Sequence, residues 1–163
     1  MPPIPDSAVF QERLAALPVA TYQAGETVFA AGSRTGRLLI LKKGAVVIIK
    51  EDVEIAKVAE PGAVFGELSV LLDQPHTAHV RALETSQFLV ADATTFLAQD
   101  PIAALYVATV LARRLDGANQ VFIQLKSQLE AGQPRSVVAK TVEKLEGLLG
   151  VSDTSLVHAD RDW

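Results

Sequence analysis

The sequence predicts an α+β fold in which a β-sandwich or barrel is flanked by helices. Between Val19 and Asp92, short β-rich runs alternate with turn residues, and glycines recur about every eight to twelve residues, which is typical of sandwiches and barrels. From Ala93 onward the apolar residues take helical spacing instead. With 163 residues, of which 49% are apolar and 21% charged, the chain is about one domain long and can bury a core without disulfides.

A short amphipathic helix is expected first, over residues 6–17, within an N-terminal segment 1–18. Asp6 or Ser7 provides its N-cap and Pro18 its stop. Its apolar positions are at helical spacing and comprise Val9, Phe10, Leu14 and Leu17.

The barrel is expected over residues 19–100. Between its apolar runs lie turn glycines, where unusual backbone dihedrals are needed: Gly25, Gly32, Gly36, Gly44 and Gly62. Near its end, "TAHVRAL" alternates Ala78, Val80 and Ala82 with polar residues, so one face of that strand is apolar. A short helix in "TTFLAQD" follows.

A long helix is predicted from Pro101 to about Glu130, in a segment 101–131. Its second half carries an apolar seam with steps of 4, 3, 4, 3 and 4, formed by Leu111, Leu115, Ala118, Phe122, Leu125 and Leu129. Such a heptad seam favours a homodimer, and packing against the chain's own barrel is the alternative. In the last segment, 132–163, an accessory amphipathic helix is expected over 135–149, followed by a frayed or disordered tail.

Several function classes are disfavoured by composition. The chain has no cysteine, which excludes disulfides, thiolate metal sites and a cysteine nucleophile. Its net charge is −4 and it lacks a basic cluster, so nucleic acid is not an expected partner. The N-terminus lacks the pattern of a signal peptide, and no apolar run approaches the length of a membrane span. We therefore expect a cytoplasmic protein.

The order of motifs resembles the cyclic-nucleotide-binding domain family, which includes the bacterial cyclic-AMP receptor protein and the regulatory subunits of protein kinase A. The resemblance covers roughly residues 10–130. "PGAVFGELSVLL" and "TAHVRA" are similar to the family's phosphate-binding cassette, here residues 64–80, while "YQAGETVFAAGS" and "ILKKGAVVI" match upstream elements. The resemblance implies a jelly-roll barrel, or double-stranded β-helix, with an N-terminal helix and a long C-terminal helix.

The resemblance also implies a ligand pocket, with cyclic AMP or cyclic GMP as ligand and no other cofactor. Amides at the start of a short helix attract an anion, Gly66 lets the backbone approach closely, and Glu67 can accept hydrogen bonds from a ribose hydroxyl. Carried over by position, the pocket residues are Gly66, Glu67, Leu68, Ser69, His76 and Thr77, with Asn119 on the long helix near the base. The alternative roles of these residues are structural. Gly66 is then a turn glycine, Glu67 an acid that complements the helix dipole, and Ser69, Thr77 and Asn119 are ordinary polar surface residues.

His76 occupies the position where the family has an arginine. Histidine offers neither a permanent charge nor a bidentate fork and is mostly neutral near pH 7, so weak or altered binding is expected. Arg81 lies too far along an extended strand to substitute, whereas Arg34 and Arg37 stay open as donors.

The sequence therefore predicts a non-catalytic sensor or regulatory domain with an altered phosphate clamp. The alternative is a ligand-independent protein-interaction or dimerisation module of the same fold. An enzyme is disfavoured, because "HTAH" lacks the histidine spacing of a barrel metal site and the sequence shows no recognisable pair of a nucleophile and a base. Only 33 residues follow Glu130, with one recognisable helix, so a DNA-binding domain does not fit within them. If the chain is whole, an effector protein is expected to receive the signal; if it is a piece of a longer protein, the output domain is outside it.

Overall fold

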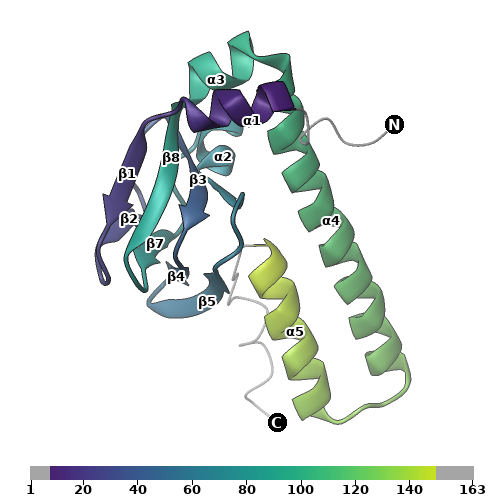
Figure 1. Ribbon diagram of the computed structural model, residues 1–163. Helices are drawn as coiled ribbons and strands as arrows, with labels where there is room; N and C mark the ends of the chain where they lie inside the picture. Colours follow the sequence, from purple (N-terminus) through teal and green to yellow (C-terminus); the bar gives the residue numbers. More distant parts are fainter. Residues whose placement is uncertain (1–7, 150–163) are drawn as a thin grey trace.

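The computed structural model describes residues 8–149, which form two four-stranded antiparallel sheets and five helices (Figure 1). One sheet has the strand order β1-β8-β3-β6 and the other β2-β7-β4-β5. The strands are β1 (Val19–Tyr22), β2 (Thr27–Phe29), β3 (Arg37–Lys43), β4 (Val46–Lys50), β5 (Val53–Val58), β6 (Val64–Phe65), β7 (His79–Ala82) and β8 (Ser86–Asp92). The helices are α1 (Ala8–Ala15), α2 (Glu67–Leu71), α3 (Ala93–Gln99), α4 (Pro101–Glu130) and α5 (Arg135–Leu149).

Strand β3 separates two hydrophobic cores. Leu39 and Leu41 pack between the sheets, in a cluster with Phe29, Phe65 and Phe88. Their neighbours on the strand, Leu38 and Ile40, pack on the other face, against residues of α1, β6, β8, α3 and α4. Since successive side chains of a strand point to opposite faces, the unbroken apolar run of β3 is explained by burial on both sides.

The helices lie over one face and one side of the sandwich. Figure 1 shows α1 and α3 together at one end of the sheets, with α4 running away from them and α5 returning beside it. Asp100 caps α4, since its carboxylate accepts hydrogen bonds from the amides of Ile102 and Ala103 at 3.0 and 3.3 Å. Helix α5 packs against both α4 and β5.

The predicted fold class is confirmed, including the short N-terminal helix and the long C-terminal helix. The short helix after the barrel and the long helix lie within one residue of their expected positions. The proposed N-cap at Asp6 or Ser7 and the expected frayed tail lie outside the described residues.

The apolar seam of α4 divides into two parts. Ala118 is buried and Leu111 and Leu125 are half-buried, whereas Leu115, Phe122 and Leu129 are each about 60% exposed (61, 59 and 61%). Packing within the chain therefore accounts for one side of the seam only. None of the described helices alone has the length and apolar content of a membrane span; α3 and α4, which meet at a bend of 104°, reach them only as a pair.

Candidate functional site: a cavity behind the cassette

Gly66 connects the edge strand β6 to α2 and cannot be replaced without a clash. Its φ of 91° lies in the left-handed region, which favours glycine. A Cβ atom at this position would lie 2.5 Å from the carbonyl oxygen of Arg37 and 3.1 Å from the Phe29 ring. The cassette therefore passes so close to β2 and β3 that its first residue must lack a side chain.

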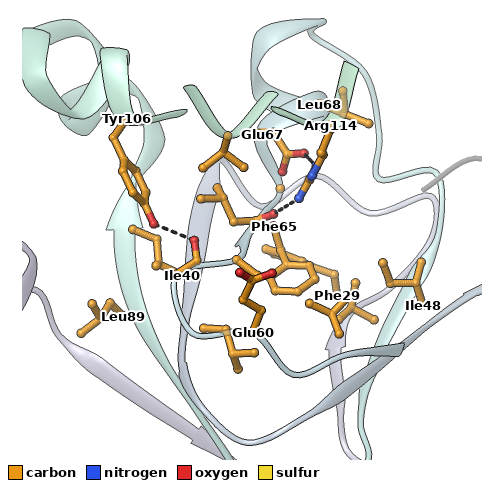
Figure 2. Close-up of a pocket in the computed structure, with 18 of the residues that line it drawn as sticks. Phe29, Ile40, Ile48, Glu60, Phe65, Glu67, Leu68, Leu89, Tyr106 and Arg114 are labelled. Atoms are coloured by element: carbon orange, nitrogen blue, oxygen red, sulfur yellow. Dashed lines mark hydrogen bonds and ion pairs between the residues drawn. The ribbon is translucent and has the colours of Figure 1, made fainter. Parts of the chain in front are cut away.

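A cavity of about 860 Å³ opens behind this turn. Its apolar lining comes from both hydrophobic cores: Phe29, Ile48 and Phe65 belong to the core between the sheets, and Ile40 and Leu89 to the core beneath the helices (Figure 2). On the side of α4, Tyr106 donates a hydrogen bond to the carbonyl oxygen of Gly62 at 2.6 Å, and burial raises the pKa of its phenol. The cavity is large enough to hold a nucleotide-sized molecule.

Glu67 points into this region and is paired with a residue of α4. Its side chain is only 4% exposed, and one of its oxygens accepts a short hydrogen bond from Nη1 of Arg114. Nη2 of the same guanidinium donates to the carbonyl oxygen of Val64 at 2.7 Å (Figure 2). Arg114 thus ties the middle of α4 to both β6 and α2, and it balances a buried negative charge.

His76 is fixed on three sides. Its ring stacks on Phe29, with centroids 4.2 Å apart and an interplanar angle of 28°. Its Nε2 lies 3.0 Å from Oγ1 of Thr35, and its backbone amide donates to the carbonyl oxygen of Ser33 at 2.9 Å. Burial lowers the pKa of His76, because desolvation disfavours the imidazolium.

The remaining predicted residues fall into two groups. Leu68, Ser69 and Thr77 line the same cavity as Gly66, Glu67 and His76. Ser69 is buried and its hydroxyl donates to the carbonyl oxygen of Gln74 at 2.5 Å, whereas Thr77 is exposed. Asn119 is exposed on α4 and is not among the described residues that line the cavity.

The arginines considered as substitute donors also lie elsewhere. Arg34 pairs with Asp73 at 2.9 Å on the surface, and Arg37 and Arg81 are exposed. None of these three belongs to the described lining of the cavity. Residues 8–149 contain no group of three or more His, Asp or Glu side chains able to hold a metal ion.

A match to a protein family covers the barrel and its cassette. Residues 19–99 match the family described as the cyclic nucleotide-binding domain. This chain belongs to that family. A cyclic nucleotide-binding domain is itself non-catalytic.

Known proteins resemble this domain at modest identity. The chain is 28% identical over 136 residues to a cGMP-dependent protein kinase of Eimeria tenella; the match covers 83% of this chain and only 12% of that protein. It is similar to the catabolite activator protein of Thermus thermophilus (22% identity, TM-score 0.59, 88% and 86% of the two chains). It also resembles the N-terminal domain of a transcriptional regulator from Streptomyces coelicolor A3(2) (30% identity, TM-score 0.53, 71% and 87%).

Two charged residues of the cavity were missed in the sequence. Arg113 and Arg114 both line it, whereas Asn119 was the residue of the long helix predicted to lie near the ligand. The available signal was the pair of adjacent arginines in the otherwise apolar stretch "LYVATVLARRL". The partner of Arg114, Glu67, is 47 residues away in sequence, so local patterns could not identify the contact.

Proposed function

We propose that this cyclic nucleotide-binding domain is a regulatory sensor that binds a cyclic nucleotide weakly in the cavity behind α2. The observation that carries the proposal is the convergence of six cassette residues on one cavity of about 860 Å³: Gly66, Glu67, Leu68, Ser69, His76 and Thr77. The cavity offers an apolar wall for a base and a buried carboxylate for a hydroxyl group.

Weak binding follows from the state of His76. A phosphate favours imidazolium, but burial of this ring favours the neutral form. Its Nε2 is also engaged with Thr35. Compared with a charge-assisted bond to arginine, the loss is about 1.5–3 kcal/mol, or roughly ten- to a hundredfold in affinity.

The direct test is isothermal titration of the full chain with cyclic AMP and with cyclic GMP, at pH 6 and pH 8. We expect dissociation constants in the micromolar range or weaker, and tighter binding at pH 6, because binding takes up a proton at His76. The nearby charged groups are the Arg34–Asp73 and Glu67–Arg114 pairs, and His79 is the other titratable ring beside this loop. Tight binding that is the same at both pH values contradicts an altered clamp.

The second candidate function is a dimerisation module, and an exposed face of α4 favours it. We define the α4 stripe as the exposed residues Leu105, Ala108, Ala112, Leu115, Asn119, Phe122, Lys126 and Leu129. Their steps alternate between 3 and 4, as in a two-stranded coiled coil. The stripe is displaced from the expected seam, because Ala118 is buried and Asn119 takes part instead.

In a parallel two-fold pair, each stripe residue faces its own counterpart. Asn119 then meets Asn119 of a second copy, and buried asparagine at such a position fixes register and strand number. The two functions are separable: a dimer that forms without any nucleotide and binds none supports the interaction module, whereas titration heat with cyclic AMP supports the sensor.

A further inference from the structure

The cavity of about 860 Å³ reaches both faces of the sheet that contains β3. Ile40 and Leu41 are neighbours on this strand and both line the cavity, although Ile40 packs beneath the helices and Leu41 between the sheets. His76 stacks on Phe29, so the cassette belongs to the side of Leu41. Figure 2 shows Tyr106 and Ile40 on one side and Phe29 on the other. We define the outer lobe as the part of the cavity lined by Leu14, Ile40, Lys42, Leu89, Tyr106 and Arg113.

The floor of the outer lobe and one of its sides are apolar. Ile40 on β3 lies opposite Leu89 on β8 in the antiparallel register. Leu14 of α1 packs in the same cluster, and Ile40 and Leu14 are buried. The turn at residues 60–62 borders the lobe as well. A molecule that occupies the outer lobe therefore contacts mostly hydrocarbon, as in most sites for small molecules.

Helix α4 forms the other side with Tyr106, Val110 and Arg113. These residues are spaced i, i+4 and i+7, so they share one face of the helix, which differs from the α4 stripe. Tyr106 is anchored by its hydrogen bond to the carbonyl oxygen of Gly62. Burial raises the pKa of its phenol, and the positive charge of Arg113 acts against this rise. The guanidinium of Arg113 therefore lies within electrostatic range of the apolar lobe.

Two cations lie at the outer lobe without an anionic partner of their own. Within residues 8–149, neither Arg113 nor Lys42 takes part in an ion pair or a side-chain hydrogen bond. Lys42 lies two residues after Ile40 on β3, and both line the lobe. Glu60, at the bordering turn, is the only acidic residue on this side of the described lining. Positive charge therefore predominates beside an apolar floor, which favours a ligand that is apolar and carries an anionic group.

We propose that the outer lobe binds a small amphiphilic carboxylate, with its apolar body on Ile40 and Leu89 and its carboxylate at Arg113. Lys42 is the second cation of the site. Medium-chain fatty acids and aryl carboxylic acids belong to this class of ligand. A guanidinium suits a carboxylate because its N–H groups form a planar fork that can bind both oxygens. The site lies on the opposite face of the sheet from the cassette, so it is separate from the proposed nucleotide site.

The experiment compares decanoate with decanol, which share the same hydrocarbon chain and differ only in the head group. The full chain is titrated with each probe at pH 8 by isothermal titration, as wild type, Arg113→Gln and Lys42→Gln. The matched controls are Arg81→Gln and Lys43→Gln, because Arg81 and Lys43 are exposed and do not belong to the described lining of the cavity.

We expect Arg113→Gln to weaken decanoate binding about tenfold and decanol binding less than about twofold, because only decanoate presents a charge to the guanidinium. Lys42→Gln should weaken decanoate about threefold, as an exposed cation contributes less. Both control variants should bind decanoate as the wild type does. Arg113 and Lys42 are exposed, so their replacement should leave the fold intact, and thermal denaturation checks this.

The position of the probe is tested separately by amide chemical shifts. With decanoate bound to the wild type, the amide signals of Ala15, Leu89 and Arg113 should shift, because these residues line the cavity on the side of the helices. The amide signals of Phe29 and Thr77, on the side of the cassette, should stay unchanged. Shifts at Phe29 and Thr77 in their place would put decanoate in the nucleotide site and overturn the proposal.

Three other results would overturn it as well. Equal losses for decanoate and decanol in Arg113→Gln would mean that the lobe does not recognise the carboxylate. Equal losses in Arg113→Gln and in the Arg81→Gln control would mean that the loss reflects the overall charge of the protein. A wild type that binds no decanoate at millimolar concentration has no such site. The proposed binding of a cyclic nucleotide stands in each case, since it is measured by its own titration.

Discussion

The imidazole of His76 stacks on the ring of Phe29, with centroids 4.2 Å apart, and so forms part of the wall between β2 and the cassette. The same Phe29 ring lies 3.1 Å from the Cβ position that glycine leaves vacant at residue 66. His76 therefore has a packing role in the wall of the cavity as well as any role in binding an anion.

Replacing His76 with arginine is expected to tighten cyclic AMP binding by about tenfold or more, because a permanent charge then faces the phosphate. The affinity of the His76→Arg variant should be the same at pH 6 and pH 8, whereas the affinity of the wild type falls as the pH rises. Isothermal titration at both pH values measures this. A suitable control is His79→Arg, since His79 lies on β7 and accepts a hydrogen bond from the amide of Ala31 at 3.1 Å. No gain from His76→Arg would indicate that stacking on Phe29, rather than charge, limits this position.

Stability should fall in acid because of His76. Burial lowers its pKa in the folded protein below 6.5, so the unfolded chain binds the proton more readily. The stability from the neutral ring is complete above pH 6.5 and is lost as the pH falls through 6.5 towards the lowered pKa. Urea denaturation at pH 7.5 and 5.5 should show a smaller acid loss for His76→Gln than for wild type.

His79 requires a parallel measurement, because its ring lies beside the same loop and its Nδ1 accepts a hydrogen bond from the amide of Ala31. His79→Gln, measured under the same conditions, isolates that contribution. An acid loss that is the same for wild type and His76→Gln would show that His76 does not govern the acid sensitivity.

Replacing Leu115 and Phe122 with glutamate should convert a dimer to monomers. Both residues are about 60% exposed within the α4 stripe (61 and 59%), so the folded protomer loses little from the change. Light scattering at high micromolar concentration measures the mass. Leu72→Glu is the control, because this cassette leucine is equally exposed, at 61%, but lies outside α4. A monomeric wild type would refute the dimer.

Replacing Gly66 with alanine should cost about 3 kcal/mol of the free energy of unfolding. Roughly 1–2 kcal/mol comes from the left-handed backbone and ~1–3 kcal/mol from the clash with β3 and Phe29. Gly132→Ala is the matched control: its φ is 66°, but nothing lies within 4 Å of its Cβ position, so only the backbone cost of ~1–2 kcal/mol applies. Urea denaturation compares the two. If both variants lose the same free energy of unfolding, the structure around Phe29 accommodates the added methyl group without cost.

The fold was predictable because its signals are local. The glycine spacing, the run of β3 and the helical periodicity after Ala93 each depend on residues near one another in sequence. The candidate site was predictable in part: six residues taken over by resemblance do line one cavity. Glu67 was identified, but its partner was not, because a contact between α2 and α4 depends on how the helix packs across the sandwich.

The α4 stripe illustrates the same limit. The 4-3 spacing predicted one apolar seam, but two overlapping seams share Leu115, Phe122 and Leu129. Ala118 is buried and Asn119 exposed, so Asn119 completes the exposed one. Sequence spacing alone does not fix which side of a helix its neighbour covers.

The contact of α4 with the cassette at Arg114 lies far from the C-terminal end of the helix. From Arg114 to Glu130 the helix extends roughly 24 Å at about 1.5 Å per residue, so a tilt of about 10° at the cassette displaces its far end by about 4 Å. That far end leads directly into α5, which also contacts β5. A small tilt of the helix where it meets Glu67 thus moves the turn between α4 and α5 by several ångströms, and the packing of α5 on β5 opposes that movement.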